Sequence, residues 1–151
     1  MTQENKELLF QDLCSRLPYG VKVCIELPNY QEKIFEEQVG DLKELTRYDE
    51  YLVNSKGIDY RSFNLNIKPY LFPLSSMTEE QYESLKESGI LSNCSHSFEY
   101  VNPHIHGVSF IFKEFKTYSL ELIEWLNKNH FDYRGLIPMG LAIDCTNLNI
   151  Y

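Results

Sequence analysis

The sequence lacks the signatures that would assign this chain to a common enzyme or membrane class. Residues 1–6 are polar, and no apolar run approaches the ~18 residues that a membrane-spanning helix needs. No GxSxG, Walker, GxGxxG or HExxH motif occurs, so the common hydrolase, ATPase, dehydrogenase and metalloprotease mechanisms have no motif support. No repeat, low-complexity tract or linker divides the chain. We therefore expect a single domain, residues 1–151, that is cytoplasmic and has no membrane partner.

Basic residues are scarce relative to acidic ones. Lys and Arg total 14 against 22 Asp and Glu, which gives a net charge of −8. Such a charge repels the phosphate backbone, whose neutralisation normally drives nucleic-acid binding. We therefore do not expect a nucleic-acid partner. An acidic surface keeps a protein soluble and also suits a basic partner protein.

Cysteines are few and widely spaced. The four residues, Cys14, Cys24, Cys94 and Cys145, form no CxxC pair, which predicts free thiols and not a disulfide framework. Cys14 falls among the apolar positions of the first predicted helix, so we expect it to be buried. Cys24 and Cys145 lie in strand-like or apolar contexts with the same expectation, which leaves Cys94 as the exposed thiol.

Apolar and aromatic residues are plentiful. Hydrophobic residues make up 43% of the chain, and 11 Tyr and 9 Phe argue against disorder. Several aromatic residues lie beside strand-like segments, namely Tyr48, Tyr51, Tyr60, Phe63, Tyr70, Phe72 and Tyr100. Most are expected to pack in the core. Some are expected to contact a partner, because tyrosine offers a large rigid ring with a polar tip.

Three segments have the apolar spacing of amphipathic helices: residues 4–17, residues 79–88, and a segment from Ser119 to near Asn129. The first must end before Pro18, because proline disfavours helical geometry in the preceding residue. The second has the strongest start signal. Thr78 and Gln81 have capping-box spacing, and Met77 and Tyr82 can form a hydrophobic staple.

The other patterns indicate short strands. Candidate strands cover residues 21–26, 34–39, 42–48, 51–53, 60–67, 98–101 and 108–113. Turn signals at Pro28-Asn29, Gly40-Asp41 and Asn54–Gly57 separate the early strands and predict an antiparallel meander. Residues 41–51 could instead form a helical turn. Residues 68–77 contain two prolines and should be extended. The strand at 108–113 is apolar on both faces and is expected to be central.

Together these elements predict an α+β fold. We expect an antiparallel sheet, or a partly rolled barrel, of about five or six short strands with three helices.

Three blocks of sequence carry a resemblance: LPYGV at 17–21, KPYLFPLSSMTEE at 68–80, and WLNKNHFDYRGLI at 125–137 followed by MGLAI at 139–143. Together they resemble a group of small uncharacterised proteins encoded by gut Bacteroidales genomes and their phages or other mobile elements. The resemblance spans most of the chain. It implies a bacterial or phage-encoded intracellular accessory protein, and it supplies no activity, cofactor or binding residue.

Four residues could form a metal site: Cys94, His96, His104 and His106. Side chains two apart on a strand point to the same face, so each pair could present two ligands to one ion, and this ligand set would suit zinc. The competing interpretation is that these histidines lie in loops or on the surface. It is favoured because nothing in the sequence supplies the second Cys pair or the carboxylate that zinc sites usually contain.

His130, Asp132 and Arg134 form a second polar group directly after the third predicted helix. They could build a general acid or an anion site. The favoured interpretation is structural, because a histidine at a helix end interacts favourably with the helix dipole, and Asp132 and Arg134 can pair across a turn.

The favoured function is a non-enzymatic accessory protein that binds another macromolecule, most readily a protein, and no cofactor is expected. One alternative is a small metal-binding protein or metal-dependent enzyme that uses zinc at the Cys94 group. The second alternative is a domain that binds a small, nucleotide-like ligand.

Overall fold

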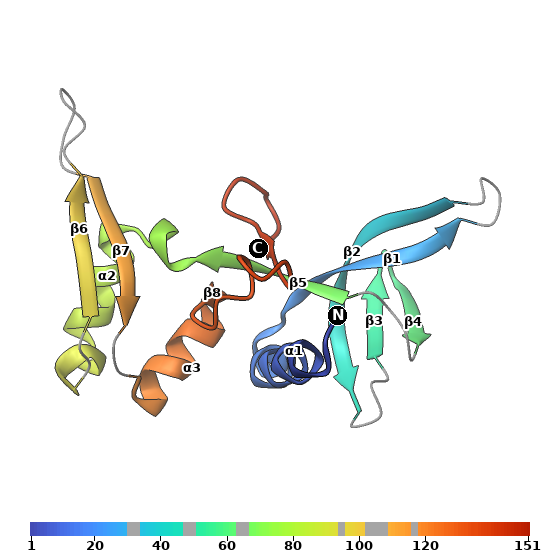
Figure 1. The fold of residues 1–151 in the computed structure, drawn as a ribbon, viewed down its shortest axis with the longest axis horizontal. Helices are drawn as coiled ribbons and strands as arrows, with labels where there is room; N and C mark the ends of the chain where they lie inside the picture. Colours follow the sequence, from blue (N-terminus) through green and yellow to red (C-terminus); the bar gives the residue numbers. More distant parts are fainter. Residues whose placement is uncertain (30–33, 47–50, 63–66, 94–95, 102–108, 116–117) are drawn as a thin grey trace. The chain divides into compact units, whose positions relative to one another are not determined.

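The computed structural model describes residues 1–29, 34–46, 51–62, 67–93, 96–101, 109–115 and 118–151, with side chains described outside 27–36, 47–50, 62–66 and 92–117. The chain forms two compact units: unit 1, Met1–Leu71 with Leu136–Tyr151, and unit 2, Phe72–Gly135. Each unit has its own apolar core. The predicted α+β class is confirmed, because three helices accompany a mostly antiparallel sheet, which is open rather than rolled into a barrel (Figure 1). Whether residues 1–151 behave as one domain stays a prediction.

Unit 1 is built on the predicted antiparallel meander. Its strands are β1 (Lys22–Asn29), β2 (Ile34–Leu45), β3 (Tyr51–Ser55), β4 (Ile58–Ser62), β5 (Ile67–Pro73) and β9 (Ile143–Asp144). They pair in the order β4-β3-β2-β1-β5, and β9 pairs with β5 in parallel. The turn predicted at Asn54–Gly57 is confirmed: Lys56 and Gly57, both with positive φ (52° and 80°), connect β3 to β4 as in a two-residue hairpin.

Gly40-Asp41 is not a turn, contrary to prediction, but lies inside the long strand β2. A Cβ at Gly40 would collide with the Val53 side chain and lie 3.0 Å from the Asn54 carbonyl oxygen, so the glycine permits close approach of β3. The strands predicted at 34–39 and 42–48 are therefore one strand as far as Leu45. The helical alternative for 41–51 is wrong for residues 41–45, and residues 47–50 lie outside the described chain.

Pro28-Asn29 is also not a turn but the end of β1. Pro28 pairs with Phe35 of β2, and among the described residues β5 pairs with β1 at Val23, Cys24 and Ile25. Proline is tolerated in a strand at positions where its missing N–H is not needed for the ladder. The prediction failed because proline reads as a turn signal unless the neighbouring strands are known.

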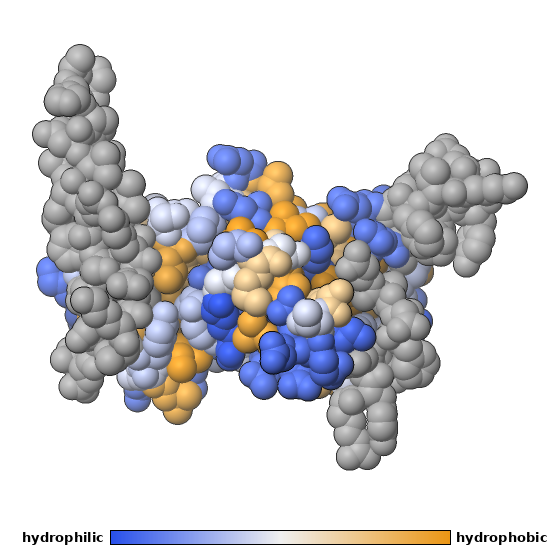
Figure 2. All heavy atoms as spheres, in the orientation of Figure 1, coloured by the Kyte–Doolittle hydropathy of each residue, from blue (hydrophilic) through white to orange (hydrophobic). Residues whose placement is uncertain are grey.

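Helix α1 (Gln3–Arg16) covers one face of this sheet. The Thr2 side chain caps it by accepting a hydrogen bond from the Asn5 N–H at 3.2 Å. As predicted, the α-helix ends before Pro18, in the 3₁₀ turn η1 (Leu17–Tyr19). The outward face of α1 is hydrophilic (Figure 2). Its inward face contributes Leu9 and Leu13 to a core with residues of the strands and of the C-terminal segment, namely Val21, Val23, Ile25, Leu42, Val53, Ile67, Leu71, Leu136, Leu141 and Ala142.

The inward face of α1 also contains an ion pair. Asp12 and Arg16 are 0% exposed, with Arg16 Nε 2.7 Å from Asp12 Oδ2 and a second hydrogen bond to Oδ1 at 3.1 Å. The prediction that Cys14 is buried on this helix is wrong, because Cys14 is exposed. Bidentate pairing offsets the cost of burying both charges, and Cys14 is rotated about 100° from buried Leu13 on the helix.

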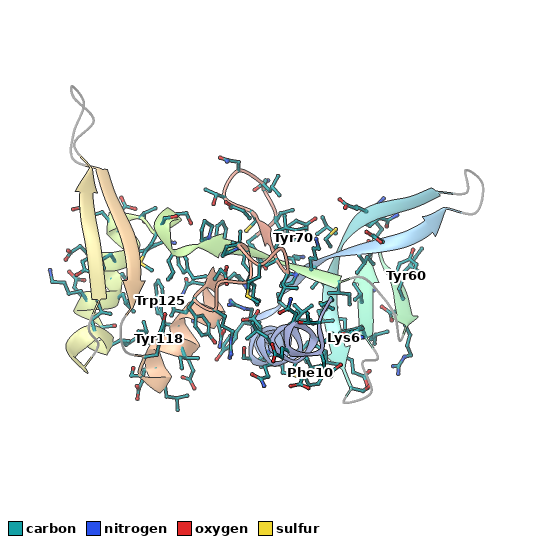
Figure 3. The ribbon with its side chains drawn as sticks, viewed as in Figure 1. Lys6, Phe10, Tyr60, Tyr70, Tyr118 and Trp125 are labelled. Carbon is teal, nitrogen blue, oxygen red and sulfur yellow. The ribbon has the colours of Figure 1, made fainter. Side chains whose placement is uncertain are left out.

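Unit 2 contains the other two helices, α2 (Glu79–Glu87) and α3 (Leu120–Lys128), the 3₁₀ turns η2 (Leu74–Ser76) and η3 (Ile90–Asn93), and β8 (Phe131–Asp132), which pairs in parallel with β5 at Phe72 and Pro73. The predicted capping box is confirmed, with Thr78 and Gln81 exchanging hydrogen bonds of 2.9 and 3.2 Å. The staple residues Met77 and Tyr82 are both buried. Trp125, labelled on α3 in Figure 3, stacks on Phe131 at a centroid distance of 5.7 Å.

A separate two-stranded sheet, β6 (His96–Val101) and β7 (Ser109–Phe115), completes unit 2. Strands were predicted in both places. The central position expected for the second is wrong within the described chain, because β7 pairs with β6 alone and its backbone otherwise lies near η2. A strand with apolar residues on both faces can pack against a turn as well as between strands. None of the helices in the described ranges combines the length and apolar character needed to cross a bilayer.

Candidate binding groove

The predicted metal ligands fall almost entirely outside the described chain. Cys94, His104 and His106 are not described, and of His96 only the backbone is, at the start of β6 opposite Phe115. Across the parts of the chain that the structure describes, no group of three or more His, Cys, Asp or Glu side chains could hold a metal ion. Convergence of these four residues therefore stays a prediction.

The second predicted group lies at the end of α3 in unit 2. His130 has a φ of 58°, the left-handed conformation that glycine usually adopts after a helix. Its N–H donates to the Asn127 carbonyl at 3.2 Å, and its own carbonyl accepts from the Phe72 N–H at 2.9 Å. His130 is therefore the residue that turns the chain from α3 into β8, and both ring and backbone are largely enclosed, at 8% exposure.

Asp132 and Arg134, which were predicted to form a site with His130, differ in burial and in their contacts. Asp132 is buried in β8, whereas Arg134 is half-buried and its Nε donates to the Tyr133 hydroxyl at 3.2 Å. The Arg134 guanidinium also lies 5.1 Å from the centre of the Tyr133 ring. These contacts of His130 and Arg134 are structural, and a general acid or anion site formed by the three residues stays a prediction.

Buried thiols and phenols in unit 1 are held in their neutral forms. Burial raises the pKa of Cys24, although its hydrogen bond with Tyr70 lowers it, and burial with the nearby Asp144 carboxylate raises the pKa of Cys145 to about 11. Burial and the same hydrogen bond raise the pKa of Tyr70 to about 12. Both cysteines are buried, as predicted. A thiol that stays protonated at neutral pH is a poor nucleophile, so neither cysteine has the environment of a catalytic one.

The C-terminal residue reinforces this part of unit 1. The Tyr151 hydroxyl donates to the Tyr70 carbonyl at 2.8 Å and accepts from the Lys22 N–H at 3.2 Å, and burial raises its pKa. These bonds fix the C-terminal segment against β5 and β1.

Among the described residues of unit 1 there is a groove of about 320 Å³ between the start of α1, the start of β5 and the turn at residues 139–141. Figure 1 shows the N-terminal end of α1 beside β5. Eight residues line it: Met1, Asn5, Leu9, Ile67, Lys68, Met139, Gly140 and Leu141. Leu9, Ile67 and Leu141 are buried and form an aliphatic floor. Met1 and Met139 are exposed walls, and methionine side chains adapt readily to the shape of a ligand.

The turn at the groove mouth is well defined. The Gly140 N–H donates to the Ile137 carbonyl at 2.9 Å, and the Leu141 N–H donates to the Leu136 carbonyl at 2.9 Å. Gly140 has a φ of 70°, and a Cβ there would meet no atom within 4 Å, so the groove is open above it.

Lys68 has the only charged side chain among the eight lining residues. Within the described chain it forms no ion pair, unlike Lys22, which lies 2.6 Å from Asp41, and Lys86, which lies 3.1 Å from Glu83. Because neighbouring residues of a strand point to opposite faces, the Lys68 side chain lies on the face of β5 opposite to Ile67, beside its cross-strand partner Cys24.

A second hollow in unit 2, at the start of α2, is less promising. It is lined by Thr78, Glu79, Glu80 and Glu83. The carboxylates repel the anions that a helix N-terminus attracts, and Thr78 already caps the helix.

Sequence reasoning identified none of the groove residues as functional. They come from three distant segments, and each segment alone has an ordinary pattern: a helix start, a strand and a turn. Neither a family model, a curated protein nor a solved structure matches the chain.

Proposed function

We propose that this chain is a non-enzymatic accessory protein of a bacterial or phage-infected cell that acts in the cytoplasm by binding another protein. The groove of unit 1 receives part of that partner. The observation that carries the proposal is the groove itself, in which two adaptable methionines border an aliphatic floor beside Lys68.

The chemistry of the groove supports binding over catalysis. Among the described residues that line it, Asn5 and Lys68 are the polar ones, and none has a carboxylate, imidazole, thiol or hydroxyl. Acid–base and nucleophilic catalysis normally need at least one of those groups within reach of the substrate. An aliphatic surface with a few polar groups provides affinity and orientation instead.

The proposal is tested with two matched variants. Met139 and Leu148 are exposed to nearly the same extent, 45% and 46%, and only Met139 lines the groove. Proteins captured from the bacterial host are identified, purified and titrated by calorimetry against the wild type, Met139→Glu and Leu148→Glu. We expect Met139→Glu to weaken binding at least tenfold and Leu148→Glu to leave it unchanged. Equal binding by both variants, or no partner that binds after purification, contradicts the proposal.

The size of the groove favours one second candidate, a small-ligand protein. Its volume of about 320 Å³ is at the lower end of the range for small-molecule pockets, ~300–1,000 Å³. Such a volume would admit a small, nucleotide-like ligand in part. Native mass spectrometry of the freshly purified protein distinguishes the two functions, because a bound metabolite adds a defined mass that the Met139→Glu variant loses.

A further inference from the structure

Strand β4 lies at one end of the strand order of unit 1, where it pairs with β3 and, among the described residues, with no other strand (Figure 1). An edge strand presents backbone N–H and C=O groups that can bind another strand. We infer that this edge binds the β4 strand of a second copy of the chain, antiparallel to it about a twofold axis at Tyr60. The edge shares no residue with the groove, so the dimer does not depend on the partner protein proposed above.

The hairpin turn determines which backbone groups of β4 face outward. Ser55 and Ile58 flank the two-residue loop and pair with each other, so they form a hydrogen-bonded pair, and such pairs alternate with non-hydrogen-bonded ones along antiparallel strands. Ile58 and Tyr60 therefore direct their N–H and C=O groups toward β3. Asp59 and Arg61 direct theirs away from β3, and a second strand can bind β4 through these two residues.

The side chains of the same two residues select one register. Residues two apart on a strand share a face, so Asp59 and Arg61 lie on one face, and both are exposed. A twofold axis at Asp59 or at Arg61 would place like charges directly opposite each other, which is unfavourable. An axis at Tyr60 places Asp59 of each copy opposite Arg61 of the other. Of the registers that pair the outward-facing residues with one another, this is the one in which opposite charges meet.

The contacts within the chain are compatible with this pairing. Arg61 Nη2 lies 3.0 Å from Glu44 Oε2, but the Arg61 side chain is still 51% exposed, and a guanidinium group has five N–H donors. Asp59 Oδ1 accepts a hydrogen bond from the Asn54 amide at 2.6 Å, and its carboxylate has a second oxygen. Each charge can therefore keep its present partner and bind the opposite charge of the second copy.

The opposite face of β4 supplies an aromatic pair. Tyr60, labelled in Figure 3, is half-buried and packs against the core of unit 1. On the axis the two Tyr60 residues form a non-hydrogen-bonded pair, with Cα atoms ~4.5 Å apart, and cross-strand aromatic pairs stabilise a sheet. Ile58 lies on the same face, is 56% exposed and would bury apolar surface against the second copy.

The charges also explain why a second copy is favoured over an arbitrary strand. Charged side chains on an edge strand normally prevent pairing. Asp59 and Arg61 prevent it with any strand that lacks the reverse order of charges, and an antiparallel second copy has that order. The net charge of −8 on each chain opposes association at long range, but salt at ~0.15 M limits this repulsion to ~8 Å.

The test exchanges the two charges. Sedimentation velocity at a series of concentrations measures dimerisation of the full chain for the wild type, Asp59→Arg, Arg61→Asp, the double variant, and an equimolar mixture of the two single variants. We expect each single variant to dimerise about tenfold or more weakly, because two pairs of like charges then lie opposite each other. The double variant and the mixture should regain the dimer, since every Arg again lies opposite an Asp.

Glu83 and Lys86 on α2 provide the matched control. They form an ion pair at 3.1 Å and are 47% and 59% exposed, similar to Arg61. Glu83→Arg and Lys86→Asp change the net charge by the same amounts as the β4 variants, and they should dimerise like the wild type. Circular dichroism establishes that each variant is folded.

A second measurement locates the axis. Tyr60→Cys should form an intermolecular disulfide on oxidation with diamide, because a Cα separation of ~4.5 Å lies within the range of disulfides. Ile58→Cys should not, since it lies opposite Ser62 of the second copy. Both variants are made in a Cys14→Ser and Cys94→Ser background, and the products are separated by non-reducing electrophoresis.

Several results would overturn the inference. A wild type that stays monomeric up to millimolar concentration excludes the dimer. Undiminished dimerisation of either single variant, or a mixture that does not regain it, excludes the pairing of Asp59 with Arg61. A disulfide in Ile58→Cys but not in Tyr60→Cys excludes the axis at Tyr60. None of these results bears on binding at the groove, so the proposed function is tested separately.

Discussion

At the scale of single residues, the Asp12–Arg16 pair determines which face of α1 is buried. Both side chains are fully enclosed, and their two hydrogen bonds are 2.7 and 3.1 Å long. A buried pair contributes little against a well-packed apolar pair of the same size, but removal of one partner leaves an uncompensated charge in the core.

We therefore expect Arg16→Met to lower the free energy of unfolding by about 3–5 kcal/mol. The double variant Asp12→Leu/Arg16→Met should recover part of that loss, because it removes both charges. Urea unfolding followed by circular dichroism measures both. The control is Arg61→Met, which breaks the exposed pair with Glu44 (3.0 Å) and should cost about 0–1 kcal/mol. If Arg16→Met is no less stable than Arg61→Met, breaking the buried pair does not have the expected cost.

Cys145 gives the protein a specific alkaline sensitivity. Burial raises its pKa from the ordinary 9.0 to about 11, so the folded state holds the thiol proton more tightly than the unfolded state does. The resulting stability is fully present below pH 9.0 and is lost as the pH rises to about 11, where the unfolded chain has already released its proton.

We expect the unfolding midpoint of the wild type to fall over this pH range and that of Cys145→Ala to fall less steeply, measured by thermal unfolding at a series of pH values. Cys14→Ala serves as the comparison, because Cys14 is exposed and its removal should change the slope less. Identical slopes for wild type and Cys145→Ala would mean that this thiol is not the group responsible.

At the scale of elements, the helix boundaries were predicted correctly because the residues that set them lie close together in the sequence. The helix boundaries follow from Pro18, the Thr78–Gln81 capping box and the Ser119 cap, all of which involve residues within one turn of each other. The turn predictions at Gly40 and Pro28 were wrong because the roles of these residues depend on neighbouring strands: Gly40 permits the approach of Val53, and Pro28 pairs with Phe35 of β2. Their meaning cannot be read without the sheet register.

The β6–β7 hairpin bears on the zinc hypothesis. The backbone of His96 pairs with that of Phe115 at the start of β6, whereas Cys94, His104 and His106 lie outside the described residues. The sequence alone does not place a second Cys pair or a carboxylate beside these four residues, although zinc sites usually contain one.

We accordingly expect substoichiometric zinc in protein purified without a histidine tag, measured by inductively coupled plasma mass spectrometry. Cys94→Ser and His104→Ala variants should show the same metal content and the same thermal stability as the wild type. Stoichiometric zinc that disappears in both variants would establish the site that the sequence pattern indicated.

At the scale of the whole molecule, the spacing of apolar residues along the sequence predicted the fold class but not the groove. Alternation and helical spacing are properties of single segments, and they were enough for an α+β assignment. The groove brings together Asn5, Lys68 and Met139, whose proximity depends on how α1, β5 and the C-terminal turn pack. Nothing in each local pattern differs from an ordinary helix, strand or turn, so the groove could be found only in three dimensions.

The division into two units raises the question of whether the chain unfolds as one domain. Strand β5 runs through the boundary between Leu71 and Phe72, and the chain returns to unit 1 at Leu136, so unit 2 is an insertion held at both ends by unit 1. A domain of about 60 residues buries only ~60% of its unfolded surface and is marginally stable alone. We therefore expect the two units to unfold together, as the single-domain prediction requires.

Two single-tryptophan proteins test this. Trp125 reports on unit 2, and Phe10→Trp combined with Trp125→Phe reports on unit 1. Leu13→Ala and Leu122→Ala each remove a fully buried side chain, one from each core, and should cost about 2–5 kcal/mol. In a cooperative domain, either substitution lowers the urea midpoint reported by both tryptophans by the same amount, because neither core can persist without the other. If Leu13→Ala shifts only the signal of the tryptophan introduced into α1 and leaves the Trp125 midpoint in place, the units are independent domains.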